Sequence, residues 1–285
     1  MKNVSIVFFL ILGLLFSNNQ NFEEKRFKLF ESEGAKSSVL FESEIFELKS
    51  VNDKHELSVD DLTGLTMDEG YPQLPIYSTL FQINPDKNYQ VDYEVLDSYI
   101  LNDVELKNYK KDADSPYSVY PKKNLSVSSP QVMRDIVLNQ IGFIPYKYYP
   151  EDRKLIVYKT VRINIEESDD SNLEYFLPQK KSRVFEEIYE SSIINYQSST
   201  RSEDYQTPSI LYICGGNIES NLSFQNLIEW KTKQGYKVYT ASTSETGSSS
   251  SSIKNYIYNA YNNFDPRPEY VALVGDANGS YSVPT

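Results

Sequence analysis

The sequence predicts two folds in series, an all-β sandwich followed by a parallel α/β sheet. Residues 18–178 alternate apolar and polar side chains in short runs that end at Pro, Asn, Asp or Gly, which is typical of antiparallel strands. A polar stretch, 179–208, follows, and from residue 209 strand-like runs alternate with helix-like runs. Such alternation predicts parallel strands joined by right-handed crossovers. We therefore expect a multidomain chain, which 285 residues permit.

The amino terminus has the pattern of a secretory signal peptide. Lys2 precedes the uncharged apolar run 4–16, and the polar residues SNNQN follow it. The run is shorter than the roughly 20 residues that cross a bilayer, and cleavage near Ser17 fits the pattern. We expect a signal peptide at 1–17, no membrane span in the mature chain, and export to the extracellular space or cell surface. A buried core helix is the alternative.

Composition excludes several kinds of site. The chain has 28 Lys and Arg against 40 Asp and Glu, a net charge of −12, which argues against nucleic-acid binding. One Cys and one His rule out an internal disulfide and a Cys/His zinc site. A catalytic triad would have to use His55, which stands in the polar run NDKHE and is expected in a solvated loop.

Five segments carry the clearest strand pattern of the sandwich, and turn signals separate them. The last of the five, LIVYKTVRINI, alternates over a full strand length. The expected strands are 38–48, 76–83, 89–96, 131–136 and 155–165.

The polar stretch 179–208 is expected to be an exposed linker, the kind of segment where proteases cut chains. It carries Arg183 and Arg201 among its basic residues. An apolar cluster within it is left open to pack against a neighbouring domain: Val184, Phe185, Ile188, Ile193 and Ile194.

From residue 209 the order is strand, helix, strand, helix, strand. Strands are expected at 210–214, 236–240 and 270–274, with a helix at 221–234 that Gly235 caps and a second helix from 253. Cys214 falls inside the first strand and is expected to be buried and inert. Three strands are few for such a sheet, so we expect that the sequence is truncated or a partial gene product.

Several of these segments, taken together in this order, resemble one family. They are ILYICGG, LIEWKTKQGYKV, IKNYIYNAYNN and PEYVALVGDANGSYSVPT in 210–285, and GYPQLPIY upstream. The first four resemble the start of the catalytic domain in the gingipain-like family of secreted cysteine peptidases. The last resembles the G-x-P-x-L-P motif of that family's propeptide.

The resemblance implies a zymogen whose catalytic domain is similar to caspases in fold. It implies that a Cys nucleophile and a His base cut protein or peptide substrates, and that a β-sandwich propeptide packs on its own peptidase domain, inhibits it and assists its folding. The family's Cys and His lie beyond the PEYVxLVGD strand, so no catalytic residue is assigned in this chain. The resulting domains are signal peptide 1–17, propeptide sandwich 18–178, linker or activation segment 179–208, and a truncated amino-terminal part of the peptidase, 209–285.

Three residues remain candidates for functional roles. Arg201, just ahead of the first peptidase strand, is the preferred activation cut and Arg183 the second; for both, a solvated linker charge is the alternative. Asp276 stands at the carboxyl end of a parallel strand, where α/β proteins place functional groups, although a turn aspartate is the plainer interpretation. No cofactor or Cys/His metal site is expected. A calcium site built from oxygens of Asp276 or Asn278 stays open.

Other functions fit parts of the sequence. The chain could be a non-enzymatic secreted binding or inhibitor module with a pseudo-enzyme stub. A nucleotide site at Cys214-Gly215-Gly216 lacks the third Gly of a dinucleotide fingerprint and the Lys of a P-loop. Carbohydrate binding by a Tyr-rich sandwich rests on the 24 Tyr alone.

Overall fold

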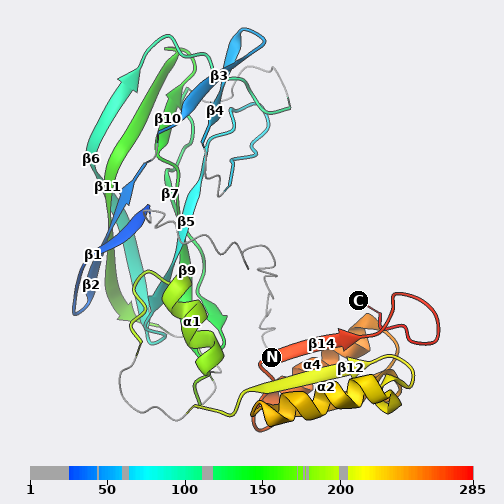
Figure 1. The fold of residues 1–285 in the computed structure, drawn as a ribbon. Coiled ribbons are helices and arrows are strands. Elements are labelled where there is room, and N and C mark those ends of the chain that lie inside the picture. Colours follow the sequence, from blue (N-terminus) through cyan, green and yellow to red (C-terminus); the bar gives the residue numbers. More distant parts are fainter. Residues whose placement is uncertain are drawn as a thin grey trace.

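Antiparallel strands build the first part of the chain and parallel strands the second (Figure 1). The computed structural model describes residues 26–43, 45–59, 64–110, 118–171, 173–175, 177, 180–198 and 205–284. The expected signal peptide, 1–17, lies outside these residues. Within them, no helix combines the length and the apolar character needed to cross a membrane.

The first sheet is centred on one long strand. β11 (Lys154–Asp170) pairs antiparallel with β2 (Lys36–Glu42), β6 (Lys87–Leu101) and β10 (Tyr146–Tyr149), and β1 (Phe27–Glu33) pairs with β2. The alternation that predicted 155–165 is visible directly, because Val161, Ile163 and Ile165 are buried while the residues between them are half-buried.

The second sheet is centred on β9 (Ile136–Phe143). It pairs antiparallel with β5 (Tyr77–Ile83), β7 (Leu125–Val127) and β8 (Gln131–Met133). A hairpin of β3 (Glu47–Val51) and β4 (Lys54–Ser58) extends the same part of the fold.

The apolar core lies between these two sheets, so the expected sandwich is confirmed. Side chains from β2, β11, β5 and β9 meet there, and the rings of Phe41 and Phe143 lie 5.3 Å apart. The opposite face of β9 is covered as well. Helix α1 (Arg183–Ser192) packs Tyr189 against Ile136 and Leu138 of β9.

The second part is a three-layer α/β unit. β12 (Ser209–Cys214) lies between β13 (Lys237–Ser242) and β14 (Tyr270–Val274), and both pairings are parallel. Alternate side chains of β12 face opposite helices, because Leu211 and Ile213 cluster with α4 (Ser250–Asn263) and Tyr212 with α2 (Leu222–Lys233). Two short helices complete the unit, η1 (Ile218–Ser220) and α3 (Thr243–Thr246).

The predicted helix of this unit begins and ends where its capping residues place it. Asn221 is the N-cap of α2, and its side chain accepts hydrogen bonds from the amides of Ser223 and Phe224. Gly235 follows the helix with φ +92°, a conformation that glycine adopts without steric cost.

Three expected segments differ from the structure. The run 38–48 is divided between β2 and β3, and the run 131–136 contains the turn between β8 and β9. That turn has no Gly or Asn to mark it in the sequence. Arg134 itself adopts the left-handed conformation, with a φ of +54°. The expectation of an exposed linker was wrong for part of 179–208, since α1 follows the N-cap Ser182, and both Tyr189 in the helix and Ile193 at its end are buried.

We predict that Ile163→Ala lowers the free energy of unfolding of the sandwich by about 2–5 kcal/mol, because the substitution leaves a cavity in the core. Ile163 has no exposed surface. Ile45→Ala is the matched control, since Ile45 is 92% exposed and its loss should change the value by less than about 0.5 kcal/mol. Denaturant unfolding followed by circular dichroism measures both. Equal effects of the two substitutions would contradict the described core.

Candidate functional site

The carboxyl edge of the parallel sheet is closed by a loop that folds back on it. Asp276 donates its amide to the Tyr281 carbonyl at 2.9 Å, and Val283 donates to the Asp276 carbonyl at 3.0 Å. This loop needs glycine beneath it, because a Cβ at Gly215 would overlap the Tyr281 carbonyl group. The Gly215-Gly216 pair that follows β12 therefore serves close backbone packing.

Asp276 has the geometry of a turn aspartate. Its carboxylate accepts the amide of Ala277 at 2.9 Å, and the residue is exposed beside an open hollow of about 710 Å³. Asn217, Asn221 and Tyr281 also line this hollow. Among the described residues, no three His, Cys, Asp or Glu side chains gather closely enough to hold a metal ion.

Cys214 is buried, as predicted. It ends β12 with no exposed surface, and burial together with the nearby Glu219 raises the pKa of its thiol to about 11. A thiol with such a pKa carries little thiolate at neutral pH and is a poor nucleophile.

His55 does not lie in a solvated loop, and that prediction was wrong. It lies half-buried in β4, where its amide donates to the Glu105 carbonyl at 2.8 Å and Nδ1 lies 3.3 Å from the same oxygen. The strand pairing of 54–58 with 47–51 draws the polar run into the fold. His55 and Cys214 thus belong to different sheets, one in each part of the chain.

The two candidate cut sites differ in their surroundings. Arg183 is the first residue of α1, and its guanidinium lies over the ring of Tyr205 at 5.0 Å. Arg201 lies outside the described residues. The segment after α1 is tied to the sandwich by the Asn195 side chain, which bonds both backbone groups of Gln82.

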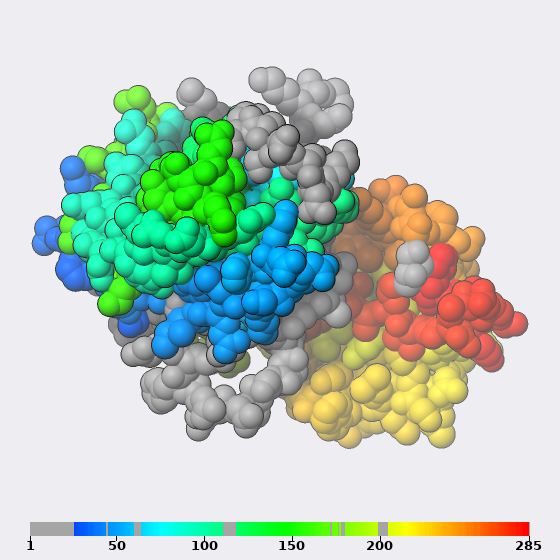
Figure 2. Space-filling view, turned by 90° about the horizontal axis from the view of Figure 1, so that it is seen from above, coloured from blue at the N-terminus to red at the C-terminus, as the bar shows by residue number. Residues whose placement is uncertain are grey.

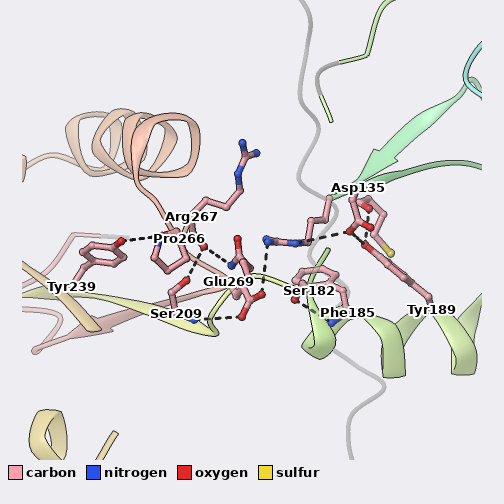
Figure 3. Close-up of polar contacts among 12 residues, drawn as sticks. Asp135, Ser182, Phe185, Tyr189, Ser209, Tyr239, Pro266, Arg267 and Glu269 are labelled. Atoms are coloured by element: carbon pink, nitrogen blue, oxygen red, sulfur yellow. Dashed lines mark hydrogen bonds and ion pairs between the residues drawn. The ribbon is translucent and has the colours of Figure 1, made fainter. Parts of the chain in front are cut away.

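The two parts of the chain lie side by side (Figure 2). They meet at a buried ion pair (Figure 3). Nη2 of Arg134, in the β8–β9 turn of the sandwich, lies 3.7 Å from Oε1 of Glu269, just before β14. The two side chains are only 2% and 1% exposed. This pair is not visible in the sequence, because neither an isolated Arg in a strand pattern nor a Glu before a strand signals a contact so far along the chain.

Helix α1 holds the sandwich side of this junction. The Arg134 guanidinium lies 5.3 Å from the ring centre of Phe185, and its Nε is 3.9 Å from Asp135. The buried Tyr189 hydroxyl donates to Asp135 at 2.7 Å and lies 3.0 Å from the Met133 carbonyl. Burial and the Asp135 carboxylate raise the pKa of Tyr189, so the hydroxyl stays protonated as a donor.

On the α/β side of the junction, residues at the starts of β12 and β14 hold Glu269 in place. Glu269 accepts the Ser209 amide at 3.4 Å and donates its own amide to the Ser209 carbonyl at 3.1 Å (Figure 3). The Arg267 carbonyl accepts from Ser209 Oγ at 2.7 Å and from Gln206 Nε2 at 2.9 Å. Gln206 also donates its amide to the Lys181 carbonyl at 3.0 Å, which adds a backbone contact between the two parts.

Two family models match the chain in succession. The family described as Propeptide_C25 matches residues 77–203, and Peptidase family C25 matches residues 203–285.

Similar proteins of known identity come from Porphyromonas gingivalis. Gingipain R2 is 23% identical over 303 aligned residues, which cover 96% of this chain and 41% of that protein. Gingipain R1 is 21% identical over 236 aligned residues, which cover 75% of this chain and 23% of that protein. The chain therefore spans about two fifths of the length of gingipain R2.

Two solved structures are also similar. One is the complex of the pro- and mature domains of Porphyromonas gingivalis RgpB, with a TM-score of 0.48 and 22% identity, covering 61% of this chain and 98% of that one. The other concerns the zymogenic latency of gingipain K from the same organism, with a TM-score of 0.42 and 14% identity, covering 50% of this chain and 93% of that one. With the successive matches to the C25 propeptide and peptidase models, this chain belongs to the gingipain-like family of cysteine peptidases, as a propeptide followed by an amino-terminal segment of the peptidase.

Proposed function

We propose that this chain is part of the exported precursor of a cysteine endopeptidase, in which the sandwich inhibits the peptidase and assists its folding. The observation that carries the proposal is the meeting of the propeptide and peptidase matches at residue 203, two residues after Arg201. Protein or peptide chains are the proposed substrates. The leader-like run at 4–16 supports export, with residues 1–17 as the proposed signal peptide.

The chemistry of such a peptidase needs residues that these 285 do not supply. A Cys thiolate attacks the peptide carbonyl, a His base handles the proton, and backbone amides stabilise the oxyanion. The one Cys is fully buried in β12, and the one His is engaged with Glu105 in β4. We therefore propose that the catalytic pair comes from residues outside this span, on a sheet of which β12–β14 form the first, caspase-like part.

The decisive test is to read the genomic sequence beyond codon 285 and express what it encodes. An open frame with a His-Gly pair and a later Cys, yielding a peptidase that the propeptide inhibits, supports the proposal. A stop codon directly after Thr285 overturns it. The non-enzymatic binding module would then become the better function.

We predict that the 285-residue chain alone does not cleave Arg or Lys peptide substrates, because its only thiol is buried. A fluorogenic peptide assay measures this, with Cys214→Ala as the control. Turnover that disappears in Cys214→Ala would contradict the inert role of this thiol.

We predict that Cys214 resists alkylation in the folded chain. At pH 8 iodoacetamide should label the native thiol at least about tenfold more slowly than the thiol of the guanidinium-unfolded chain, because the folded thiol is buried and its pKa is about 11. Mass spectrometry of the labelled chain measures both rates. Equal rates would show that β12 is open to solvent.

We predict that activation cleavage depends on Arg201. Arg201→Ala should abolish the cut made by a trypsin-like protease near the start of the peptidase segment. Arg183→Ala is the matched control and should leave that cut unchanged, because the helical backbone at Arg183 does not fit a protease cleft that binds extended chain. Amino-terminal sequencing of the products identifies the cut, and loss of it in Arg183→Ala alone would reverse the assignment.

A further inference from the structure

We infer that Arg134 and Glu269 are the recognition pair by which the sandwich selects its own peptidase sheet. This inference rests on the proposed function, because it treats the two parts as separate pieces after a cut between residues 198 and 205. The partner is a parallel sheet that presents a buried carboxylate at its amino edge.

The pair lies at the amino edge of the parallel sheet, opposite the edge where α/β proteins place catalytic groups. Ser209 begins β12 and Glu269 directly precedes β14, so both belong to the amino edge of the parallel strands. Ligands and catalytic groups of α/β sheets gather at the carboxyl edge, where the loop of Asp276 lies. A contact at the amino edge can hold the sandwich in place without occupying the carboxyl edge of the sheet.

Burial makes this pair selective. Nη2 and Oε1 are 3.7 Å apart, and neither atom makes a hydrogen bond within the described residues. A buried pair with this geometry gains little over apolar side chains of the same size, but removal of one member leaves an uncompensated charge. A sheet without Glu269, or a sandwich without Arg134, is therefore bound less well than the native partner, because binding buries an uncompensated charge.

The sandwich holds Arg134 in place before the sheet arrives. Its left-handed φ of +54° costs a non-glycine residue free energy, which the surrounding contacts must offset. Phe185 lies under the guanidinium and Asp135 lies 3.9 Å from Nε, while Tyr189 holds Asp135. Helix α1 thus positions the guanidinium toward the sheet.

Arg134 and Glu269 have different charged neighbours, so their loss should have effects of different size. Arg134 has two carboxylates near it, Asp135 and Glu269, whereas Glu269 has Arg134 as its ion-pair partner among the described residues. Removing Arg134 leaves the buried Glu269 without its ion-pair partner among the described residues. Removing the charge of Glu269 leaves Arg134 with Asp135. Loss of Arg134 should therefore be the more damaging change, and neutralising Glu269 should relieve it.

The other contacts across the proposed cut are less selective. The Gln206 amide donates to the Lys181 carbonyl, and Arg183 lies over Tyr205. A backbone hydrogen bond does not depend on side-chain identity, and Arg183 is exposed to solvent. These contacts add affinity that any related pair could share.

The test measures how fast the two pieces exchange after a defined cut. The full chain receives a site-specific protease sequence in place of residues 199–204 and is cut after folding. Isotope-labelled and unlabelled cut chains are mixed, and native mass spectrometry follows the exchange of pieces. Arg134→Met should speed exchange about 30-fold or more, Glu269→Gln less, and the double variant should return to the rate of Glu269→Gln.

Two further variants complete the design. Arg153→Ala is the matched control, since Arg153 has the same left-handed backbone in an exposed turn of the sandwich, and it should exchange like the native chain. Glu269→Lys places a like charge beside Arg134 and should speed exchange more than Glu269→Gln, which tests the pair even where Arg134→Met fails to fold.

The inference is overturned by three outcomes. They are exchange of Arg134→Met within twofold of the native rate, additive effects in the double variant, and native pieces that separate as soon as they are cut. None of these readouts involves peptidase activity. Failure of the proposed function would appear in the genomic test and leave the exchange rates interpretable.

Discussion

Strand β9 is buried on both faces, and the arrangement of the two parts depends on this. Val137, Ile141 and Phe143 point into the sandwich, while Ile136 and Leu138 pack against α1. An antiparallel strand commonly leaves one face to solvent. Here the second face needs a cover, and α1 supplies it. The helix thereby fixes the turn that begins β9, and through Arg134 it fixes the point where the peptidase segment contacts the sandwich.

Regions that obey one local rule were predictable from sequence. The alternation of 155–165 gave β11, the short apolar run 270–274 gave β14, and Asn221 and Gly235 marked the ends of α2. Each of these signals arises from neighbours in the chain or from a single buried face. The sandwich followed by a parallel sheet could therefore be predicted, and family resemblance added what the two parts are for.

Regions whose structure depends on distant partners could not be predicted. α1 has an apolar face of its own, but it stands in a polar stretch, and nothing near it in the sequence shows that this face covers β9. The turn at Arg134-Asp135 lacks the Gly or Asn that most readily adopts a left-handed φ, and contacts with Phe185 and Asp135 hold Arg134 in a conformation that it disfavours. His55 lies in a strand because its partner strand and Glu105 draw it in. Arg134 and Glu269 were invisible for the same reason.

The long sequence separation between Arg134 and Glu269 also has a consequence for how the molecule is made. The β8–β9 hairpin involves only local pairing and can form early, whereas closing a loop across the rest of β9, β10, β11, α1 and most of the α/β unit is slow. Domains generally fold in order from the amino terminus, so we expect the sandwich to fold before the strand that follows Glu269 is added. We expect the guanidinium of Arg134 to be in place when the last strand arrives, which is the order that the proposed folding role of the propeptide requires.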